Sequence, residues 1–411
     1  MPQDETGAVS ATVADTTRHP WPVLLILSLL MGFASISTDL YLPALPTMAA
    51  SLHASAGNVE FTISGYLIGF SLGQLLWGPI GDRHGRRGPI ATGLVLFIIG
   101  SAGCALSGNA AAMIGWRVVQ AVGACASVVL ARAMVRDLYK GNRAARMLST
   151  LITMMAIAPL VGPSLGGEIL AFAGWRAIFW TLVGVGVLTF AAVWTLPDTL
   201  PPVRRNPEPL IVAFSRYGLL LRDRRLLAFA GAGGFFFGGT FAYIAGSPFA
   251  YIAYHRLPAR LYGLLFGAGI IGLILTNLIG TRLIMRIGSL RMLVVGNSIA
   301  ALAGIILAID SRTDWGGLAG LAVPLFVFVS VTGLIIANSV AGVMGMFPGR
   351  AGAVSALVGA IQYGAGVAGS ALVGALADGT PWPMGLVIGV AGIGGLACAC
   401  SSSVIGSRAG A

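Results

Sequence analysis

The stretch Gly78-Pro79-Ile80-Gly81-Asp82-Arg83-His84-Gly85-Arg86-Arg87 is a short charged segment between two apolar runs, near residues 59–79 and 88–106. Glycine lets two helix ends approach closely, and an acid is stabilised beside arginines or at a helix N-terminus. Each flanking run has about the 20 apolar residues that a helix needs to cross a bilayer. The segment therefore predicts a tight turn between two membrane-spanning helices.

The rest of the chain repeats this pattern of apolar runs and short polar breaks. Of its 411 residues, 56% are hydrophobic and 9% charged, and the mean hydropathy is +0.88, which excludes a soluble globular protein. We predict an all-α integral membrane protein with twelve transmembrane helices. They are expected near 22–44, 59–79, 88–106, 111–136, 148–170, 176–197, 227–251, 261–281, 290–309, 317–344, 353–376 and 382–404.

The longest stretch without a predicted span is basic and divides the helices into two sets of six. The predicted parts are an N-terminal tail 1–21, a six-helix bundle 22–197, a linker 198–226, a second six-helix bundle 227–404 and a C-terminal tail 405–411. Because no small-residue cleavage site follows the first apolar run, we expect that span to remain in the mature protein. Two such halves predict parallel repeats packed around a cavity at the membrane midplane.

The basic residues are distributed unevenly between the two predicted sides. Of the 25 Lys and Arg, 19 fall on the side of the N-terminus and four on the other, with Arg117 and Arg132 inside the fourth predicted span. The positive-inside rule therefore predicts that both termini are cytoplasmic. The net charge of +11 is explained by these loops, so we expect no nucleic-acid partner.

The sequence offers little for catalysis or metal binding. The four cysteines lie in apolar runs without metal-ligand spacing, and the four histidines lie in tails or loops. No phosphate-binding Gly-Lys-Ser/Thr turn is present. We therefore expect no enzyme activity, no metal, no cofactor and no direct use of ATP.

A weaker copy of the opening turn follows the eighth predicted span. With Gly85 aligned on Gly288, Arg83 meets Arg286, whereas Asp82 meets Met285. The first copy resembles the signature turn of the major facilitator superfamily. That resemblance implies the family's fold and a cytoplasmic gate motif, whose acid and arginines hold the outward-open state. The residues concerned are Gly78, Asp82, Arg83, Gly85, Arg86 and Arg87.

The first predicted span ends in an acid, Asp39, within the string Asp-Leu-Tyr-Leu-Pro-Ala-Leu-Pro that occupies residues 39–46. An acid in an apolar run is costly, so it usually faces a cavity or a partner. The alternative is a helix-end acid at the headgroup level. The string resembles the first-span signature of Bcr/CflA drug exporters, which implies that Asp39 binds the proton and cationic substrates.

The fourth predicted span carries Arg117 at nearly the depth of Asp39, since the two helices run in opposite directions and rise about 1.5 Å per residue. An arginine facing the same cavity would give the acid a counter-charge, and the alternative is snorkelling to the interface. The segment resembles the family motif Arg-x-x-Gln-Gly-x-Gly with Ala121 in place of a glycine, which implies proton transfer. For Arg132 we expect snorkelling or pairing with Asp137.

The fifth predicted span contains small residues and proline, which permit close helix packing and a bend. It resembles the antiporter motif of drug:proton exchangers, which favours export, through Gly162, Pro163, Gly166 and Gly167. Glu60 and Glu168 are expected to be solvated caps at outer helix ends. Polar or aromatic side chains that would contact substrate, as opposed to lipid or core, are Ser35, Asp39, Tyr66, Gln120, Tyr243 and Gln362.

The resemblance covers residues 20–404 and implies a monomeric, multi-pass inner-membrane exporter that exchanges drugs or small amphiphiles for protons by alternating access. The bilayer, protons and a small molecule are its expected partners. The alternative is a proton-coupled importer of a small metabolite, which shares the fold. A membrane-embedded enzyme is disfavoured because no nucleophile and base lie together in the sequence pattern.

Overall fold

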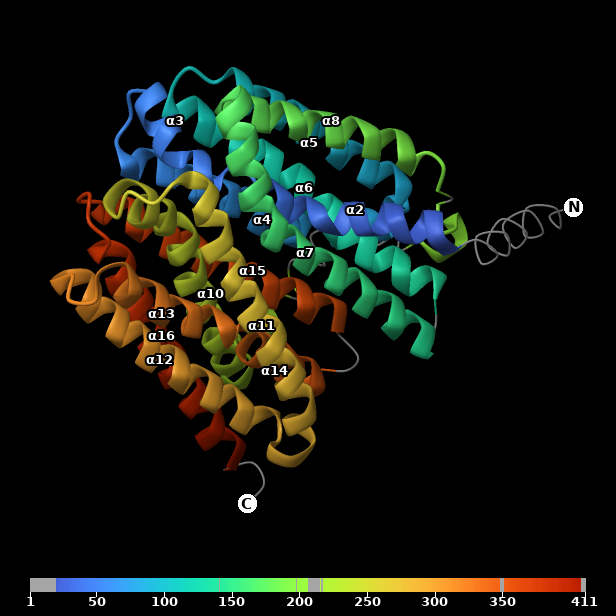
Figure 1. The fold of residues 1–411 in the computed structure, drawn as a ribbon. Helices are drawn as coiled ribbons and strands as arrows, with labels where there is room; N and C mark the ends of the chain where they lie inside the picture. The colour runs from blue at the N-terminus through green and yellow to red at the C-terminus, as the bar shows by residue number, and fades with distance from the viewer. Residues whose placement is uncertain are drawn as a thin grey trace, which may run out of the picture.

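The computed structural model describes residues 20–139, 141–196, 198–205, 215, 217–347 and 351–407, which form helices joined by short connections (Figure 1). The predicted N-terminal tail lies almost entirely outside these residues. Parts of the predicted linker 198–226 and of the predicted C-terminal tail also lie outside them.

The first half of the chain is a series of long helices interrupted once by a short turn. Its helices are α2 (Pro20–Asp39), the 3-10 turn η1 (Leu42–Ala44), α3 (Leu45–Ser51), α4 (Ala56–His84), α5 (Arg87–Leu106), α6 (Ala110–Leu138), α7 (Gly141–Ala173) and α8 (Trp175–Val193). A 3-10 turn, η2 (Pro202–Arg204), follows in the connection to the second half.

The second half has the same character. Its elements are α10 (Arg224–Pro248), the π-helical turn η3 (Phe249–Tyr254), α11 (Ala259–Ile287), α12 (Ser289–Thr313), α13 (Gly317–Ser330), α14 (Thr332–Met346), α15 (Ala351–Leu376) and α16 (Trp382–Ser407). The predicted span 317–344 is thus divided near Val331 into α13 and α14. All twelve predicted spans fall on helices, and the all-α membrane fold is confirmed.

Among the described residues, eleven helical segments are long and apolar enough to cross a membrane, counting α13 and α14 as one. The described part of α7 contributes a shorter apolar segment, Ala158–Ala173. Polar residues set several helix starts. The side chains of Ser55, Asn109 and Asp223 accept hydrogen bonds from backbone N–H groups in the first turns of α4, α6 and α10.

The helices form two bundles that meet mainly along two helix pairs. The helices up to α8 pack on one another, as do those from α10 onward, and the bundles touch where α4 meets α15 and α7 meets α11. Figure 1 shows the bundles close together where α3 and η3 lie, and spread apart toward the ends where the described chain begins and finishes. We call these ends the far side and the termini side.

The far side is closed by close backbone contacts between the bundles. A Cβ atom on Gly57 of α4 would lie 2.1 Å from the carbonyl oxygen of Gly374 in α15. A Cβ atom on Gly263 of α11 would lie 2.4 Å from Ser164 Oγ in α7. Since nothing larger than glycine fits at these two positions, the glycines permit the closure of the far side.

Candidate functional site

The helix α2 stops at Asp39, so the carboxylate sits at a break in the helix. Pro43 and Pro46 lie in the first turns of η1 and α3, where their rings suit a helix start but prevent continuation of the preceding helix. Asp39 is only 5% exposed. Within the described part of the chain, its carboxylate has neither a hydrogen bond nor an ion pair.

The predicted antiporter motif of α7 packs directly on this break. A Cβ atom on Gly162 would lie 3.1 Å from Asp39 Cβ, and one on Gly166 would lie 1.8 Å from the carbonyl oxygen of Leu40. Gly167 lies against Ala259 at the start of α11, in the other bundle. The small residues of α7 therefore let that helix approach both Asp39 and the second bundle, a relation that the sequence alone does not reveal.

Aromatic residues of the second bundle complete the surroundings of Asp39. Its carboxyl interacts electrostatically with Tyr243 of α10, Tyr262 of α11 and Tyr363 of α15. Tyr262 and Ser247 share a hydrogen bond of 3.0 Å, and the ring of Tyr243 stacks on Phe266 at 5.4 Å between centroids. Sequence reasoning selected Tyr243 but missed Tyr262, since a tyrosine in an apolar helix gives no signal of which partner it faces.

Arg117 is completely buried in α6 and is held by polar and aromatic groups. Its Nη1 donates to the carbonyl oxygen of Ser37 at 3.0 Å and to Gln120 Oε1 at 2.6 Å. The guanidinium lies 4.3 Å from the ring centroids of both Tyr41 and Tyr66. Two cation–π contacts and the bond to a backbone carbonyl stabilise the guanidinium in this apolar region. The snorkelling alternative is wrong, because the side chain has no exposed surface.

Asp39 and Arg117 act on the same segment of α2 without forming an ion pair. Arg117 binds the backbone at Ser37, two residues before Asp39. Its Nε and Nη2 atoms are buried and have no hydrogen-bond partner among the described residues. Gln120 extends the contact by donating from Nε2 to Ser101 Oγ at 2.7 Å. A buried donor pair without an acceptor can bind a carboxylate or an acceptor group of a small molecule when the helices rearrange.

The other residues selected for substrate contact are distributed over both bundles. Ser35 is half-buried on α2, and Tyr66 is buried on α4. Gln362 is buried on α15, and its Nε2 atom has no hydrogen-bond partner among the described residues. Beside Gln362, Tyr363 packs against aromatic rings from both bundles. Its ring centroid lies 4.4 Å from that of Phe70 in α4 and 5.2 Å from that of Phe237 in α10.

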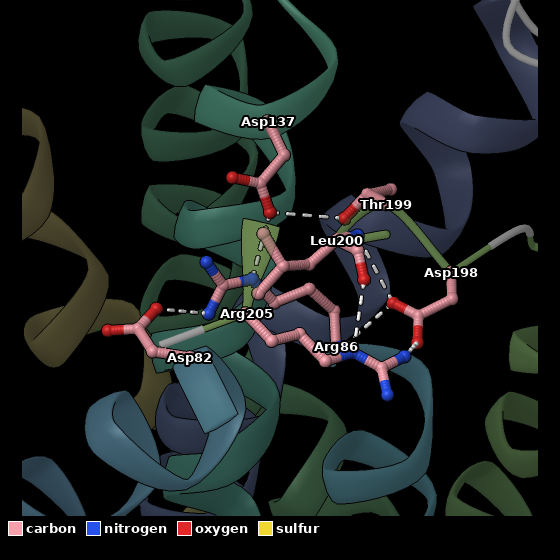
Figure 2. A network of polar contacts seen from close by, with 7 residues as sticks. All are labelled: Asp82, Arg86, Asp137, Asp198, Thr199, Leu200 and Arg205. Carbon is pink, nitrogen blue, oxygen red and sulfur yellow. Dashed lines mark hydrogen bonds and ion pairs between the residues drawn. The ribbon is translucent and has the colours of Figure 1, made fainter. Parts of the chain in front are cut away.

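The predicted gate turn is built around Arg86, as Figure 2 shows. Its Nη1 atom donates to Asp82 Oδ1 at 2.7 Å and its Nε atom to Asp137 Oδ2 at 2.8 Å, the latter at the end of α6. Burial disfavours the charged guanidinium, but the bonds and charges of Asp137 and Asp82 outweigh it and raise the pKa of Arg86. Asp137 is bound by Arg86, and no ion pair joins it to Arg132 among the described residues. Of the two alternatives for Arg132, pairing with Asp137 is therefore wrong, and snorkelling stays a prediction.

The same turn holds the start of the interbundle connection. Asp198 Oδ1 accepts from the backbone N–H of Arg86 at 2.9 Å, and its Oδ2 accepts from Arg205 Nη2 at 3.2 Å (Figure 2). Gly85 has a φ of +90°, and a Cβ atom there would lie 2.2 Å from Asp198 Oδ2.

Of the other residues of the predicted gate motif, Arg83 is exposed, and a Cβ atom on Gly78 would meet nothing within 4 Å in the described chain. The contacts of Asp137 and Asp198 with this turn were missed, because both residues lie far from the motif in sequence.

The two far-side acids that were expected to be solvated, Glu60 and Glu168, differ in the structure. Glu168 is 47% exposed and pairs with Arg260 at 3.1 Å across the bundles. Glu60 is only 3% exposed, so the expectation of a solvated cap is wrong for it. The reason is that α4 begins at Ala56, which places Glu60 inside the helix, where α15 covers it.

These features define a polytopic membrane transporter, with a buried acid at the junction of two helical bundles. The profile of the Major Facilitator Superfamily matches residues 27–255, which is more than half of the chain. The chain belongs to this superfamily. Its members are transporters rather than enzymes, so the protein is a multi-pass membrane transporter.

Relatives match over nearly the whole length. YdgK, an uncharacterized MFS-type transporter of Bacillus subtilis, is 34% identical over 93% of this chain and 96% of its own. A bicyclomycin resistance protein homolog of Haemophilus influenzae is 29% identical over 89% and 92%. A chloramphenicol resistance protein of Pseudomonas aeruginosa is 31% identical over 94% and 91%. The predicted resemblance to drug-resistance transporters of this type is confirmed.

Solved structures support the fold. A D-xylose–proton symporter superposes with a TM-score of 0.74 over 93% of this chain and 97% of its own, at 16% identity. A partially occluded, inward-open structure of the xylose transporter XylE from E. coli gives a TM-score of 0.67 over 92% and 96%, at 15% identity. At these identities the likeness concerns the fold and not the substrate.

Proposed function

We propose that this protein exports drugs or small amphiphilic compounds in exchange for protons. The observation that carries the proposal is Asp39, a buried acid at the helix break, packed against Gly162 and without a partner among the described residues. The printed names of two relatives, a bicyclomycin resistance homolog and a chloramphenicol resistance protein, support export of such compounds.

In the proposed cycle, a proton and a substrate compete for Asp39. An unpaired carboxylate is costly to bury, and either a proton or a cationic group of the substrate removes that cost. Substrate enters from the termini side, which we propose is the cytoplasm, and leaves on the far side. A proton from the far side then takes its place and favours the return of the carrier. Each ligand thus shifts the same conformational equilibrium.

Arg117 and the gate turn have distinct proposed roles. Arg117 binds the backbone of α2 at Ser37, two residues before Asp39. A change in the charge of Asp39 therefore changes the electrostatic attraction between Arg117 and this end of α2. Arg86 fixes the termini-side ends of α4 and α6 and the start of the linker as one unit. We further propose that residues 22–197 and 227–404 rock as two bundles, with the protein acting as a monomer in the bacterial inner membrane.

The test uses inverted membrane vesicles that contain the wild-type protein, Asp39→Asn or Glu168→Gln. An inside-acid proton gradient is imposed, and internal pH is followed with a fluorescent dye while cationic and neutral drugs are added. We expect drugs to dissipate the gradient through the wild type and Glu168→Gln, because Glu168 is exposed and paired. Asp39→Asn should give no drug-dependent signal.

Two outcomes would count against the proposal. If no drug releases protons through the wild type, while a small metabolite moves with protons in the same direction, the protein is an importer. If Asp39→Asn responds to drugs as the wild type does, Asp39 is not the coupling site. Equal protein amounts in the vesicles and equal melting temperatures in detergent establish that the variants are folded.

A further inference from the structure

We propose that Glu60 is a second protonation site, set between α4 and α15, and that its exchange of a proton with far-side water controls the opening of the far side. This inference rests on the alternating-access cycle proposed above. It assigns Glu60 a role separate from that of Asp39: Glu60 regulates opening, whereas Asp39 couples the proton to the substrate.

The geometry places Glu60 inside the contact between the bundles. Its Oε2 atom is buried and has no hydrogen-bond partner among the described residues. A Cβ atom on Gly374 of α15 would lie 3.5 Å from Glu60 Cβ, and the neighbouring contact of Gly57 with Gly374 is even closer. An isolated ionised carboxylate is expensive in such surroundings, whereas its protonated form is tolerated. The closed contact therefore favours Glu60 with its proton bound.

Within the described part of the chain, no charged group compensates for this burial. The elements packed against α4 and the loops that flank its start carry titratable or charged groups that include Tyr41, His53, Cys104, Arg117, Cys125, Tyr243, Tyr363 and Asp378. Among the described residues, Glu60 forms no ion pair with any of them, and its Oε2 atom has no hydrogen-bond partner. We therefore expect water to reach the carboxyl group of Glu60 when α4 and α15 separate.

The contact also determines from which side a proton reaches Glu60. One turn toward the termini side, Ser64 and Ser370 share a hydrogen bond of 2.8 Å across the bundles. Beyond it, the fully buried side chain of Leu67 in α4 packs near Gly366 of α15. A Cβ atom on Gly366 would lie 3.4 Å from Leu67 Cδ1. These contacts separate Glu60 from the termini side. A proton taken up from far-side water and returned to it adds nothing to net proton transport, so Glu60 acts as a switch for opening.

The sign of the effect follows from linkage. Because the closed far side binds the proton and the open far side releases it, raising the far-side pH favours opening. In the Glu60→Gln variant the side chain keeps its size and cannot ionise, so the opening should lose this dependence on pH. In Glu60→Asp an acid remains, so the dependence should persist with a shifted midpoint.

The experiment measures the opening directly in nanodiscs. Spin labels are placed at the exposed positions Asn58 and Ala375, after Cys398 and Cys400 are replaced by alanine, and the distance distribution is recorded from about pH 5 to about pH 9. We expect the long-distance population of the wild type to grow several-fold with rising pH. Glu60→Gln should keep the short distance throughout.

A second readout separates this inference from the proposed function. In the drug-dependent proton assay, Glu60→Gln should keep the wild-type number of protons per drug, whereas Asp39→Asn should lose the signal. Glu60 is not a switch if Glu60→Gln opens with the same pH dependence as the wild type. It is a coupling site instead if Glu60→Gln changes the number of protons per drug. If the opening of Glu60→Asp still depends on pH, the loss of this dependence in Glu60→Gln is due to the missing carboxyl group and not to a damaged fold.

Discussion

The turn after α4 and the turn after α11 have nearly the same backbone but very different surroundings. Each helix ends at a glycine with positive φ, +90° at Gly85 and +83° at Gly288. Around Gly85, Arg86 and Asp198 form a network of ion pairs and hydrogen bonds. Around Gly288, a Cβ atom would meet nothing within 4 Å among the described residues, and Arg286 is exposed.

The difference shows that one backbone shape serves two purposes. A glycine with positive φ is needed wherever two long helices reverse direction in so few residues, so both turns retain it. The charged network is a separate feature, and it joins three elements of the first bundle to the connection between the bundles. We expect substitutions in the first turn to be more damaging than the same substitutions in the second.

The largest effect is expected for Arg86→Ala. It leaves the partly buried carboxylate of Asp137 without its partner and removes the contact with Asp82, so the variant should lose about 2 kcal/mol of stability. Its counterpart Arg286→Ala should change stability by less than about 0.5 kcal/mol, since the side chain is exposed. Thermal unfolding of the two purified variants in the same detergent measures the difference. Equal melting temperatures would mean that the network does not stabilise the fold.

A smaller effect is expected for Gly85→Ala compared with Gly288→Ala. Both substitutions place a side chain at positive φ, which costs about 1 kcal/mol. At Gly85 the new methyl group also meets Asp198 and Arg205, so it displaces a carboxylate that binds the Arg86 backbone. The first variant should therefore melt at a lower temperature than the second. If the two variants lose the same stability, backbone strain alone determines the effect.

The sequence was sufficient for the fold because membrane helices leave a strong one-dimensional signal. Runs such as 88–106 are uniformly apolar, and the observed α5, Arg87–Leu106, agrees with the prediction closely. The prediction was poorer where polarity did not mark the boundary. The division at Val331 and the end of α2 at Asp39 depend on local backbone geometry and on proline rings, and both fall inside apolar runs.

The candidate site was less predictable, because its contacts join residues that are distant in the chain. Motifs identified Asp39, Arg117 and Gly162 singly, but that Gly162 packs on Asp39 depends on how α7 lies across α2. Glu60 was misjudged for a related reason. A helix-end acid looks solvated in sequence, and only the position of α15 shows that it is covered.

A more local effect is expected for Asp198→Ala, which removes the bond between the interbundle connection and the turn after α4. The carboxylate accepts hydrogen bonds from the backbone of Arg86 and Leu200 and pairs with Arg205, contacts worth about 1 kcal/mol together because the pair is partly solvated. Trypsin should then cleave after Arg205 faster than in the wild type. The matched variant Asp223→Ala, at the start of α10, lies outside the network and should not accelerate this cleavage. An unchanged cleavage rate in Asp198→Ala would show that the connection is held by other contacts.

The smallest effect on stability is expected for Asp82→Asn, although Asp82 is the residue that most distinguishes the first turn from the second. Its carboxylate is 55% exposed and pairs only with Arg86 one turn along, among the described residues, so the loss should be about 0.3 kcal/mol. A marked loss of drug-dependent proton release with an unchanged melting temperature would therefore place the function of Asp82 in a different state of the cycle. Unchanged transport would show that the gate depends on Arg86 and Asp137, and that the acid missing from the second turn is dispensable in the first.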